Sequence, residues 1–121
     1  MYRVGLAAVA TGLLSVVAIA PASATGQTSV YTGGREAGRV NYWSSTDDFR
    51  VSDTKCDGHT VHAEYQRAGA SKRKLVNSGG CGTYADYNRS FTGGQSIKYR
   101  ICVDYSAGID PCSAWKWDTT G

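Results

Sequence analysis

The chain has 121 residues, with 13 Lys or Arg against 10 Asp or Glu, so its formal net charge is +3. So small a basic excess argues against a protein that binds nucleic acid or an anionic membrane through its overall charge. The one basic cluster, residues 71–74, is expected to be a solvated loop tip. The length suffices for one domain.

The first 24 residues have the layout of a secretory signal peptide. Arg3 precedes an apolar run from Val4 to Ala20, and residues 22–24 form an A-x-A cleavage site. Pro21 and several polar residues interrupt the apolar segment, which argues against a membrane span. We therefore predict a secreted, extracellular protein that begins at Thr25 and has no membrane segment after cleavage.

The segment Thr25–Gly38 reads TGQTSVYTGGREAG and is rich in Gly and Thr. Its only apolar pair is Val30-Tyr31. This composition predicts a flexible N-terminal arm rather than a part of the core. If the arm becomes ordered on a partner, Val30 and Tyr31 are the residues that would anchor it.

From Arg39 onward, apolar and polar residues alternate with period two, the pattern of half-buried β-strands. Turn signals rich in glycine separate the alternating runs, and no helical period is sustained. The pattern predicts that residues 39–121 form an all-β domain, a small antiparallel β-sandwich or barrel stapled by two disulfides. Strands are expected within residues 39–45, 49–53, 59–66, 74–78, 83–88, 96–105 and 112–117. Their alternation groups Val40 with Tyr42, Phe49 with Val51, Val61 with Ala63 and Tyr65, and Ile97 with Tyr99, Ile101 and Val103.

All four cysteines, Cys56, Cys81, Cys102 and Cys112, follow the signal peptide. An even number of cysteines in a small exported chain predicts two disulfides, each worth about 2–4 kcal/mol. Four cysteines allow three pairings, and the sequence does not choose among them. Our expectation is the two sequential pairs, Cys56–Cys81 and Cys102–Cys112. A zinc site is the alternative, but the spacing contains no C-x-x-C pair.

The stretch DTKCDGHTVHAE, residues 53–64, has partial similarity to a calcium-binding loop. Lys55 stands where such a loop needs an oxygen ligand, and strand-like residues flank the stretch where an EF-hand has helices. His59 and His62 are three residues apart, so on a strand they face opposite sides and cannot share a metal. We predict a hairpin-type turn with surface-exposed histidines and no metal or cofactor, although a looser calcium site from Asp53 and Asp57 stays open.

The sequence contains no recognisable catalytic constellation. There is no G-x-S-x-G motif, the cysteines are expected in disulfides, and the carboxylates are scattered over the predicted turns. We therefore predict a protein that is not an enzyme. Aromatic residues are abundant, and Trp43, on the opposite face from Val40 and Tyr42, is a candidate for binding a protein or a sugar.

The strings FRVSDTKCDG, KYRICVDY and CSAW follow one another along residues 49–115. In this order they resemble the small secreted β-sandwich proteins of filamentous actinobacteria, over about Arg39 to Trp117. Within that group the chain is similar to the UmbB-type subunit of umbrella toxin particles, which links a lectin-like subunit to a large toxin subunit. The resemblance implies a non-enzymatic adaptor in interbacterial antagonism, with other secreted proteins as partners and an N-terminal arm that inserts into one of them.

Two alternatives belong to other classes of function. Proteinaceous α-amylase inhibitors are small secreted all-β proteins with four cysteines, and they present a Trp-Arg-Tyr triplet on an exposed turn. This chain has Tyr42-Trp43-Ser44 instead, and its cysteine spacing differs. The other alternative is a small carbohydrate-binding module that uses exposed tryptophans.

Overall fold

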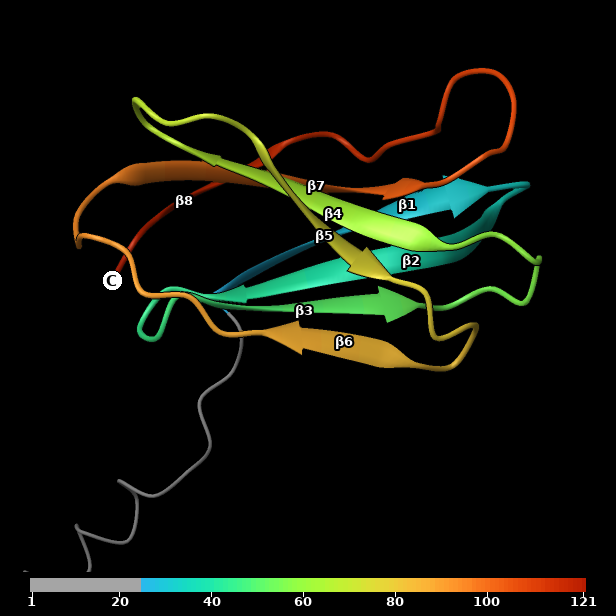
Figure 1. The fold of residues 1–121 in the computed structure, drawn as a ribbon, viewed down its shortest axis with the longest axis horizontal. Helices are drawn as coiled ribbons and strands as arrows, with labels where there is room; N and C mark the ends of the chain where they lie inside the picture. Colours follow the sequence, from blue (N-terminus) through green and yellow to red (C-terminus); the bar gives the residue numbers. More distant parts are fainter. Residues whose placement is uncertain (1–24) are drawn as a thin grey trace, which may run out of the picture.

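The computed structural model describes residues 25–121, and the predicted signal peptide lies outside the described residues. These residues form two four-stranded antiparallel sheets (Figure 1). The first sheet has the order β1-β2-β3-β6, and the second has the order β5-β4-β7-β8. The strands are β1 (Gly26–Thr32), β2 (Arg35–Trp43), β3 (Asp48–Asp53), β4 (Val61–Arg67), β5 (Arg73–Asn77), β6 (Tyr84–Tyr87), β7 (Ser96–Val103) and β8 (Lys116–Thr119).

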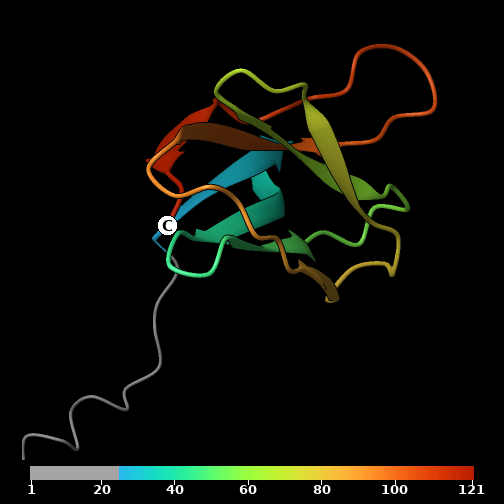
Figure 2. The same ribbon diagram turned by 60° about the vertical axis from the view of Figure 1, so that its left-hand side comes forward.

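The two sheets stack face to face, as the turned view in Figure 2 shows, and the loop after β7 projects from the sandwich. The predicted all-β antiparallel sandwich is therefore confirmed. Among residues 25–121, no helix is long and apolar enough to cross a membrane.

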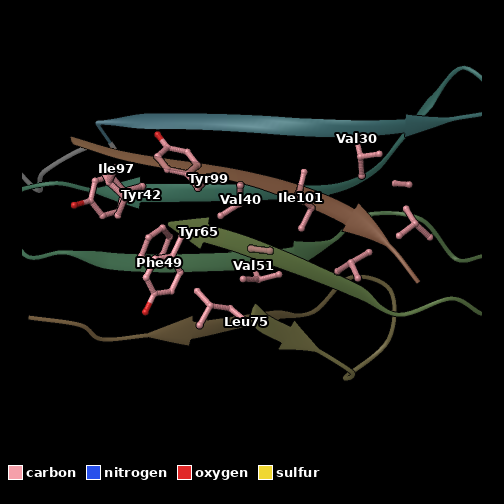
Figure 3. Packing of buried hydrophobic residues seen from close by; sticks show 14 residues of the cluster. Val30, Val40, Tyr42, Phe49, Val51, Tyr65, Leu75, Ile97, Tyr99 and Ile101 are labelled. Atoms are coloured by element: carbon pink, nitrogen blue, oxygen red, sulfur yellow. The ribbon is translucent and has the colours of Figure 1, made fainter. Parts of the chain in front are cut away.

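The core lies between the two sheets and contains the residues that alternation groups together (Figure 3). Tyr42 and Phe49 from the first sheet meet Tyr65 and Tyr99 from the second. Their ring centroids lie 4.7 Å apart for Tyr42–Phe49, 4.9 Å for Phe49–Tyr65 and 5.4 Å for Tyr42–Tyr99. Such pairs stabilise a fold by more than their buried area alone, so four aromatic rings can hold a small sandwich together.

The buried carboxylate of Asp47 ties three segments together at one end of the sandwich. It accepts hydrogen bonds from the Tyr42 hydroxyl at 2.8 Å, the Phe91 amide at 2.9 Å and the Gly121 amide at 3.1 Å. Asp47 has a positive φ of 61°, a conformation that aspartate tolerates better than most residues in a tight turn. Burial, and then the hydrogen bond to Asp47, raises the pKa of the Tyr42 hydroxyl.

The disulfides pair Cys56 with Cys81 and Cys102 with Cys112, which confirms the expected sequential pairing. Cys56–Cys81 joins the β3–β4 connection to the turn before β6. Cys102–Cys112 joins β7 to the segment before β8, which runs antiparallel beside it. Two disulfides are typical of proteins from oxidising compartments.

The prediction of a flexible arm at Thr25–Gly38 is wrong for these residues. Residues 26–32 form β1, which pairs with β2 along its whole length, and residues 35–38 begin β2. Gly33 and Gly34, with φ of 60° and 78°, make the two-residue turn that joins the two strands. Tight hairpins require a positive φ at these two positions, so the glycines mark a turn rather than disorder.

The composition of β1 explains why its alternation is weak. Val30 is buried in the core, but Gly26, the first residue of the same strand, lies against the hydroxyl of Tyr99. A Cβ at Gly26 would collide with that hydroxyl. An inward position taken by glycine leaves Val30 as the one strongly buried apolar residue of the strand, too little for a period-two signal.

The run expected within residues 112–117 is a strand only at its end, because β8 begins at Lys116. Cys112 forms an isolated bridge with Cys102, and residues 113–115 separate this bridge from β8. Of the two tryptophans of the run, Trp117 therefore lies within β8, whereas Trp115 lies just before the strand.

Candidate functional site

The outer face of the first sheet carries a cluster of an arginine and aromatic rings. Arg50 lies on β3, with Asn41 of β2 and Asp86 of β6 as its direct neighbours across the strands. Its guanidinium lies 3.7 Å from the ring centroid of Tyr84 and 6.0 Å from that of Trp43. We call Arg50, Tyr84, Trp43 and Asp86 the Arg50 surface.

Hydrogen bonds fix the geometry of the Arg50 surface. Nε and Nη2 of Arg50 donate to the two carboxylate oxygens of Asp86 at 2.7 and 2.9 Å. This hydrogen-bonded pair raises the pKa of the Arg50 guanidinium. A hollow of about 270 Å³ lies beside the cluster, with Trp43, Asp48 and Asp86 among its lining residues. The arginine is thus presented as a fixed, flat donor on a rigid sheet.

The structure separates the three residues predicted to bind a partner. Val30 is buried in the core, so its prediction as a partner anchor is wrong. Tyr31 is exposed, but it pairs with Glu36 near the start of β2, whereas Trp43 is the last residue of β2. Trp43 joins the Arg50 surface instead. Tyr42 is buried, so Tyr42-Trp43-Ser44 does not form an exposed inhibitor-like triplet.

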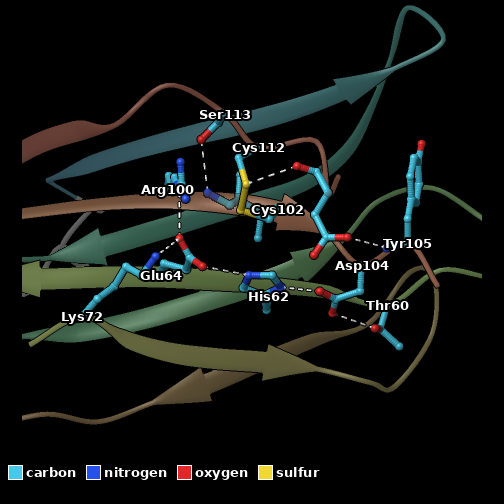
Figure 4. A network of polar contacts seen from close by, with 12 residues as sticks. Thr60, His62, Glu64, Lys72, Arg100, Cys102, Asp104, Tyr105, Cys112 and Ser113 are labelled. Atoms are coloured by element: carbon cyan, nitrogen blue, oxygen red, sulfur yellow. Dashed lines mark hydrogen bonds and ion pairs between the residues drawn. A yellow bond between two sulfur atoms is a disulfide. The ribbon is translucent and has the colours of Figure 1, made fainter. Parts of the chain in front are cut away.

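The outer face of the second sheet carries a buried polar network around His62 (Figure 4). The residue is only 3% exposed, so the prediction of a surface histidine is wrong. Its Nδ1 lies 2.5 Å from Oδ1 of Asp104, and its Nε2 lies 3.3 Å from Oε2 of Glu64. Across the strands His62 faces Cys102, which is fully buried in its disulfide. Alternation predicted correctly that His62 points away from the core, but not that its neighbours bury it.

Glu64 is the centre of this network. Its Oε1 accepts a hydrogen bond from Nε of Arg100 at 2.8 Å and lies 3.4 Å from Nζ of Lys72. Burial by itself raises the pKa of Glu64, but the hydrogen bond and charge of Arg100, with His62 and Lys72, outweigh it and lower the pKa. Both ring nitrogens of His62 are thus engaged by carboxylates, which is not the arrangement of a base beside a nucleophile.

Residues 54–60 connect β3 of the first sheet to β4 of the second, so the predicted turn is a connection between sheets rather than a hairpin. Oδ1 of Asp57 accepts a hydrogen bond from the amide of His59 at 3.1 Å, a local turn contact. The ring of His59 packs against Tyr105 at 4.7 Å. Burial raises the pKa of Asp53, whose carboxylate accepts a hydrogen bond from the Lys55 amide.

Two tryptophans lie on the outer face of the second sheet, near the end that is farther from His62. Nζ of Lys98 lies 4.4 Å from the ring centroid of Trp115 and 5.5 Å from that of Trp117. Arg100 also lies over Trp115, at 4.4 Å. Trp117 is 62% exposed and borders a hollow of about 290 Å³ that is also lined by Gln66, Arg67, Ala68, Gly69, Ser96 and Lys98. The run CSAWKW contains both tryptophans, but nothing in the sequence indicated that Lys98 and Arg100 lie beside their rings.

No protein-family model, curated protein or solved structure matches this chain.

Proposed function

We propose that this chain is a secreted, non-enzymatic adaptor that binds another protein through the Arg50 surface. The observation that carries the proposal is the Arg50 guanidinium stacked on the exposed ring of Tyr84, with Trp43 beside it. Arg, Tyr and Trp are the residue types in which the hot spots of protein interfaces are enriched. A cluster of all three types on one sheet face, with Tyr84 exposed and Arg50 and Trp43 partly exposed, therefore favours a protein partner.

The rigidity of the cluster supports this proposal. Asp86 holds Arg50 by two hydrogen bonds, and both side chains stand on paired strands. A preorganised arginine loses less conformational entropy when a partner covers it than a free one does. The charge of Arg50 is already balanced by Asp86, so the surface suits a partner with an aromatic or amide-rich contact rather than a strongly acidic one.

This proposal moves the binding element from the N-terminal segment to the sheet. Deletion of Thr25–Gly38 would remove β1 together with the start of β2, and with them the buried side chain of Val30. Such a deletion tests folding before it tests binding, so substitutions on the Arg50 surface are the appropriate probe.

For the identity of the partner we rely on the resemblance to UmbB-type subunits of umbrella toxin particles. On this basis we propose that the partners are other secreted proteins, a lectin-like subunit and a large toxin subunit of an antibacterial assembly. The resemblance, rather than the geometry of the Arg50 surface, supports this part of the proposal.

The test is affinity capture from the culture medium of the producing organism, with the tagged mature protein as bait. We expect the wild type and Trp117→Ala to retain the same large secreted proteins, and Arg50→Ala and Tyr84→Ala to lose them. Trp117→Ala is the matched control because it removes an exposed aromatic residue from the opposite sheet. Retention by all four proteins, or by none, would contradict binding through the Arg50 surface.

A second candidate function is the binding of a carbohydrate at Trp117. An exposed indole is a platform on which a sugar ring can stack, and the neighbouring hollow has Lys98, Gln66 and Ser96 as hydrogen-bonding groups. The lining contains two basic residues and no carboxylate, so an acidic sugar is the favoured ligand.

The same variants separate the two functions. In affinity electrophoresis through a polyuronate gel, a carbohydrate-binding module should be retarded, and Trp117→Ala should remove the retardation while Arg50→Ala keeps it. Equal mobility of the wild type and Trp117→Ala would exclude this second function.

A further inference from the structure

Three residues form a row across the outer face of the second sheet. Lys98 on β7 lies directly opposite Gln66 of β4 on one side and Trp117 of β8 on the other. All three line the hollow of about 290 Å³ beside Trp117. The paired strands fix their spacing at roughly 5 Å from one strand to the next. Lys98 points outward, because Ile97 and Tyr99 on either side of it in β7 are buried in the core.

Lys98 differs from the other basic residues on this face in having no carboxylate partner. Within residues 25–121 it forms no ion pair. Arg100 and Lys72 both contact the carboxylate of Glu64, as Figure 4 shows. These two residues therefore have an anionic contact inside the protein, and Lys98 does not.

Arg67, the other basic residue that lines the hollow, is engaged elsewhere. Its guanidinium lies 4.6 Å from the ring centroid of Phe91, and its Nη1 donates to Oε1 of Gln95 at 3.2 Å. Across the strands Arg67 faces Ile97, a core residue, so its side chain leaves the strand on the core side of the sheet. Of the two basic residues in the lining, Lys98 is thus the one whose charge is directed to the outer face.

Two indole rings hold the ammonium group of Lys98 in place. Its Nζ lies 4.4 Å from the ring centroid of Trp115 and 5.5 Å from that of Trp117. Trp115 is itself held by Arg100, whose guanidinium lies 4.4 Å from the same ring. The two rings limit the contact of the ammonium with water, so an anion bound there interacts with it more strongly than with a fully solvated lysine.

We propose that Lys98 makes this hollow selective for a sugar that carries a carboxylate, with the sugar ring stacked on Trp117. This inference rests on the second candidate function, carbohydrate binding at Trp117, and names the residue that selects the ligand. Stacking on an indole needs only the apolar face of a sugar ring. Lys98, directly opposite, supplies the one ionic contact and so separates acidic from neutral sugars. Gln66 donates to the carbonyl of Ala70 at 3.0 Å, which leaves its Oε1 to accept from a sugar hydroxyl.

The test is isothermal titration of the mature protein with oligogalacturonate and, separately, with its methyl ester at neutral pH. The two ligands have the same rings and hydroxyls, but the ester carries no charge. We expect the wild type to bind the acid about fivefold more tightly, the effect of one partly exposed ionic contact. Lys98→Gln should bind both ligands with the wild-type affinity for the ester, and Lys98→Arg should restore the preference for the acid.

Lys116→Gln is the matched control, because it removes the same charge from the residue next to Trp117. The aliphatic chain of Lys116 lies against Gly26 of the first sheet and does not line the hollow, so the preference for the acid should be unchanged. Trp117→Ala should weaken the binding of both ligands by about tenfold, because both lose the stacking contact. Higher salt should reduce the affinity of the wild type for the acid and leave that for the ester unchanged.

The results distinguish a failure of the role of Lys98 from a failure of carbohydrate binding. Equal affinity of the wild type for both ligands, or a preference for the acid that persists in Lys98→Gln, would overturn the role of Lys98 while carbohydrate binding stands. An equal loss of preference in Lys116→Gln and Lys98→Gln would overturn it too, because it would show attraction to the net charge of the chain. Heat from neither ligand at millimolar concentration would exclude carbohydrate binding and this inference with it.

Discussion

The two outer faces of the sandwich each contain an arginine–carboxylate pair of nearly the same length. On the first sheet Nε of Arg50 lies 2.7 Å from Asp86, and on the second Nε of Arg100 lies 2.8 Å from Glu64. The side chains of the first pair are 37% and 49% exposed, and those of the second are 26% and 14% exposed. The contact is the same, but its surroundings differ. The first pair belongs to a surface that solvent reaches, and the second belongs to a network that its neighbours bury.

We attribute the burial of the second face to the disulfide next to His62. The chain turns back after β7 and is bonded to β7 through Cys102–Cys112, directly across from His62. Within residues 25–121, the neighbours of Arg50 on both sides are strand residues, Asn41 and Asp86, and no disulfide or returning segment lies across from it on the first face. We therefore expect changes on the second face to affect stability and changes on the first to affect binding.

The largest expected effect follows from removal of the disulfides one at a time. Loop-closure entropy alone predicts a loss of about 3.5 kcal/mol for Cys56–Cys81 and about 2.7 kcal/mol for Cys102–Cys112. The loops span 25 and 10 positions, respectively. We expect the opposite order, because Cys102 is fully buried beside His62 whereas Cys56 and Cys81 are exposed. Urea unfolding of the two Cys→Ala double variants measures the difference.

A larger loss of stability without Cys56–Cys81 than without Cys102–Cys112, the order that loop length predicts, would contradict the expectation that the second face is the stabilising one. It would mean that the Cys102–Cys112 bond stabilises the fold only through the unfolded chain, and that the network around His62 does not depend on it.

Sequence alternation predicts the side on which a residue lies, but not what covers that side. It placed Phe49, Val51, Tyr99 and Ile101 in the core correctly, because the interior of a sandwich is covered whatever the loops do. It failed for His62, because burial on the outer face depends on contacts with residues distant in sequence, such as Asp104.

The N-terminal strand shows the opposite failure. A hydrophobic pattern needs large residues, and β1 uses Gly26 because the hydroxyl of Tyr99 fills the space beside it. Gly33 and Gly34 close the β1–β2 hairpin, yet in a Gly- and Thr-rich segment such a pair indicates flexibility as readily as a turn. The Arg50 surface was missed because its members come from three strands whose order the sequence did not specify.

The loss of folding stability at acid pH should differ between the arginine–carboxylate pairs of the two faces. The folded-state pKa of Glu64 lies below its usual value of 4.5, so its stabilising contribution is complete above that value and is lost as the pH falls below it. Glu64→Gln should cost about 1–3 kcal/mol at pH 7 and flatten this loss of stability. Asp86→Asn, on the exposed pair, should change stability by less than about 1 kcal/mol. The measurement is urea unfolding of the three proteins between pH 7 and pH 3, and parallel curves for wild type and Glu64→Gln would contradict the assignment.

The smallest expected effect is the coupling energy of the exposed pair itself. In a double-mutant cycle with alanine, Arg50 and Asp86 should couple by about 0.2–1 kcal/mol, because solvent screens both charges and both side chains lose entropy when they pair. The same cycle for Arg100 and Glu64 should give a larger value, because Glu64 is mostly buried and also contacts His62 and Lys72. Raising the salt concentration should reduce the first coupling more than the second, since screening acts mainly on exposed charges. Equal couplings would mean that the distance between the charged groups, rather than their surroundings, determines their strength, and the distinction between a binding face and a stabilising face would no longer hold.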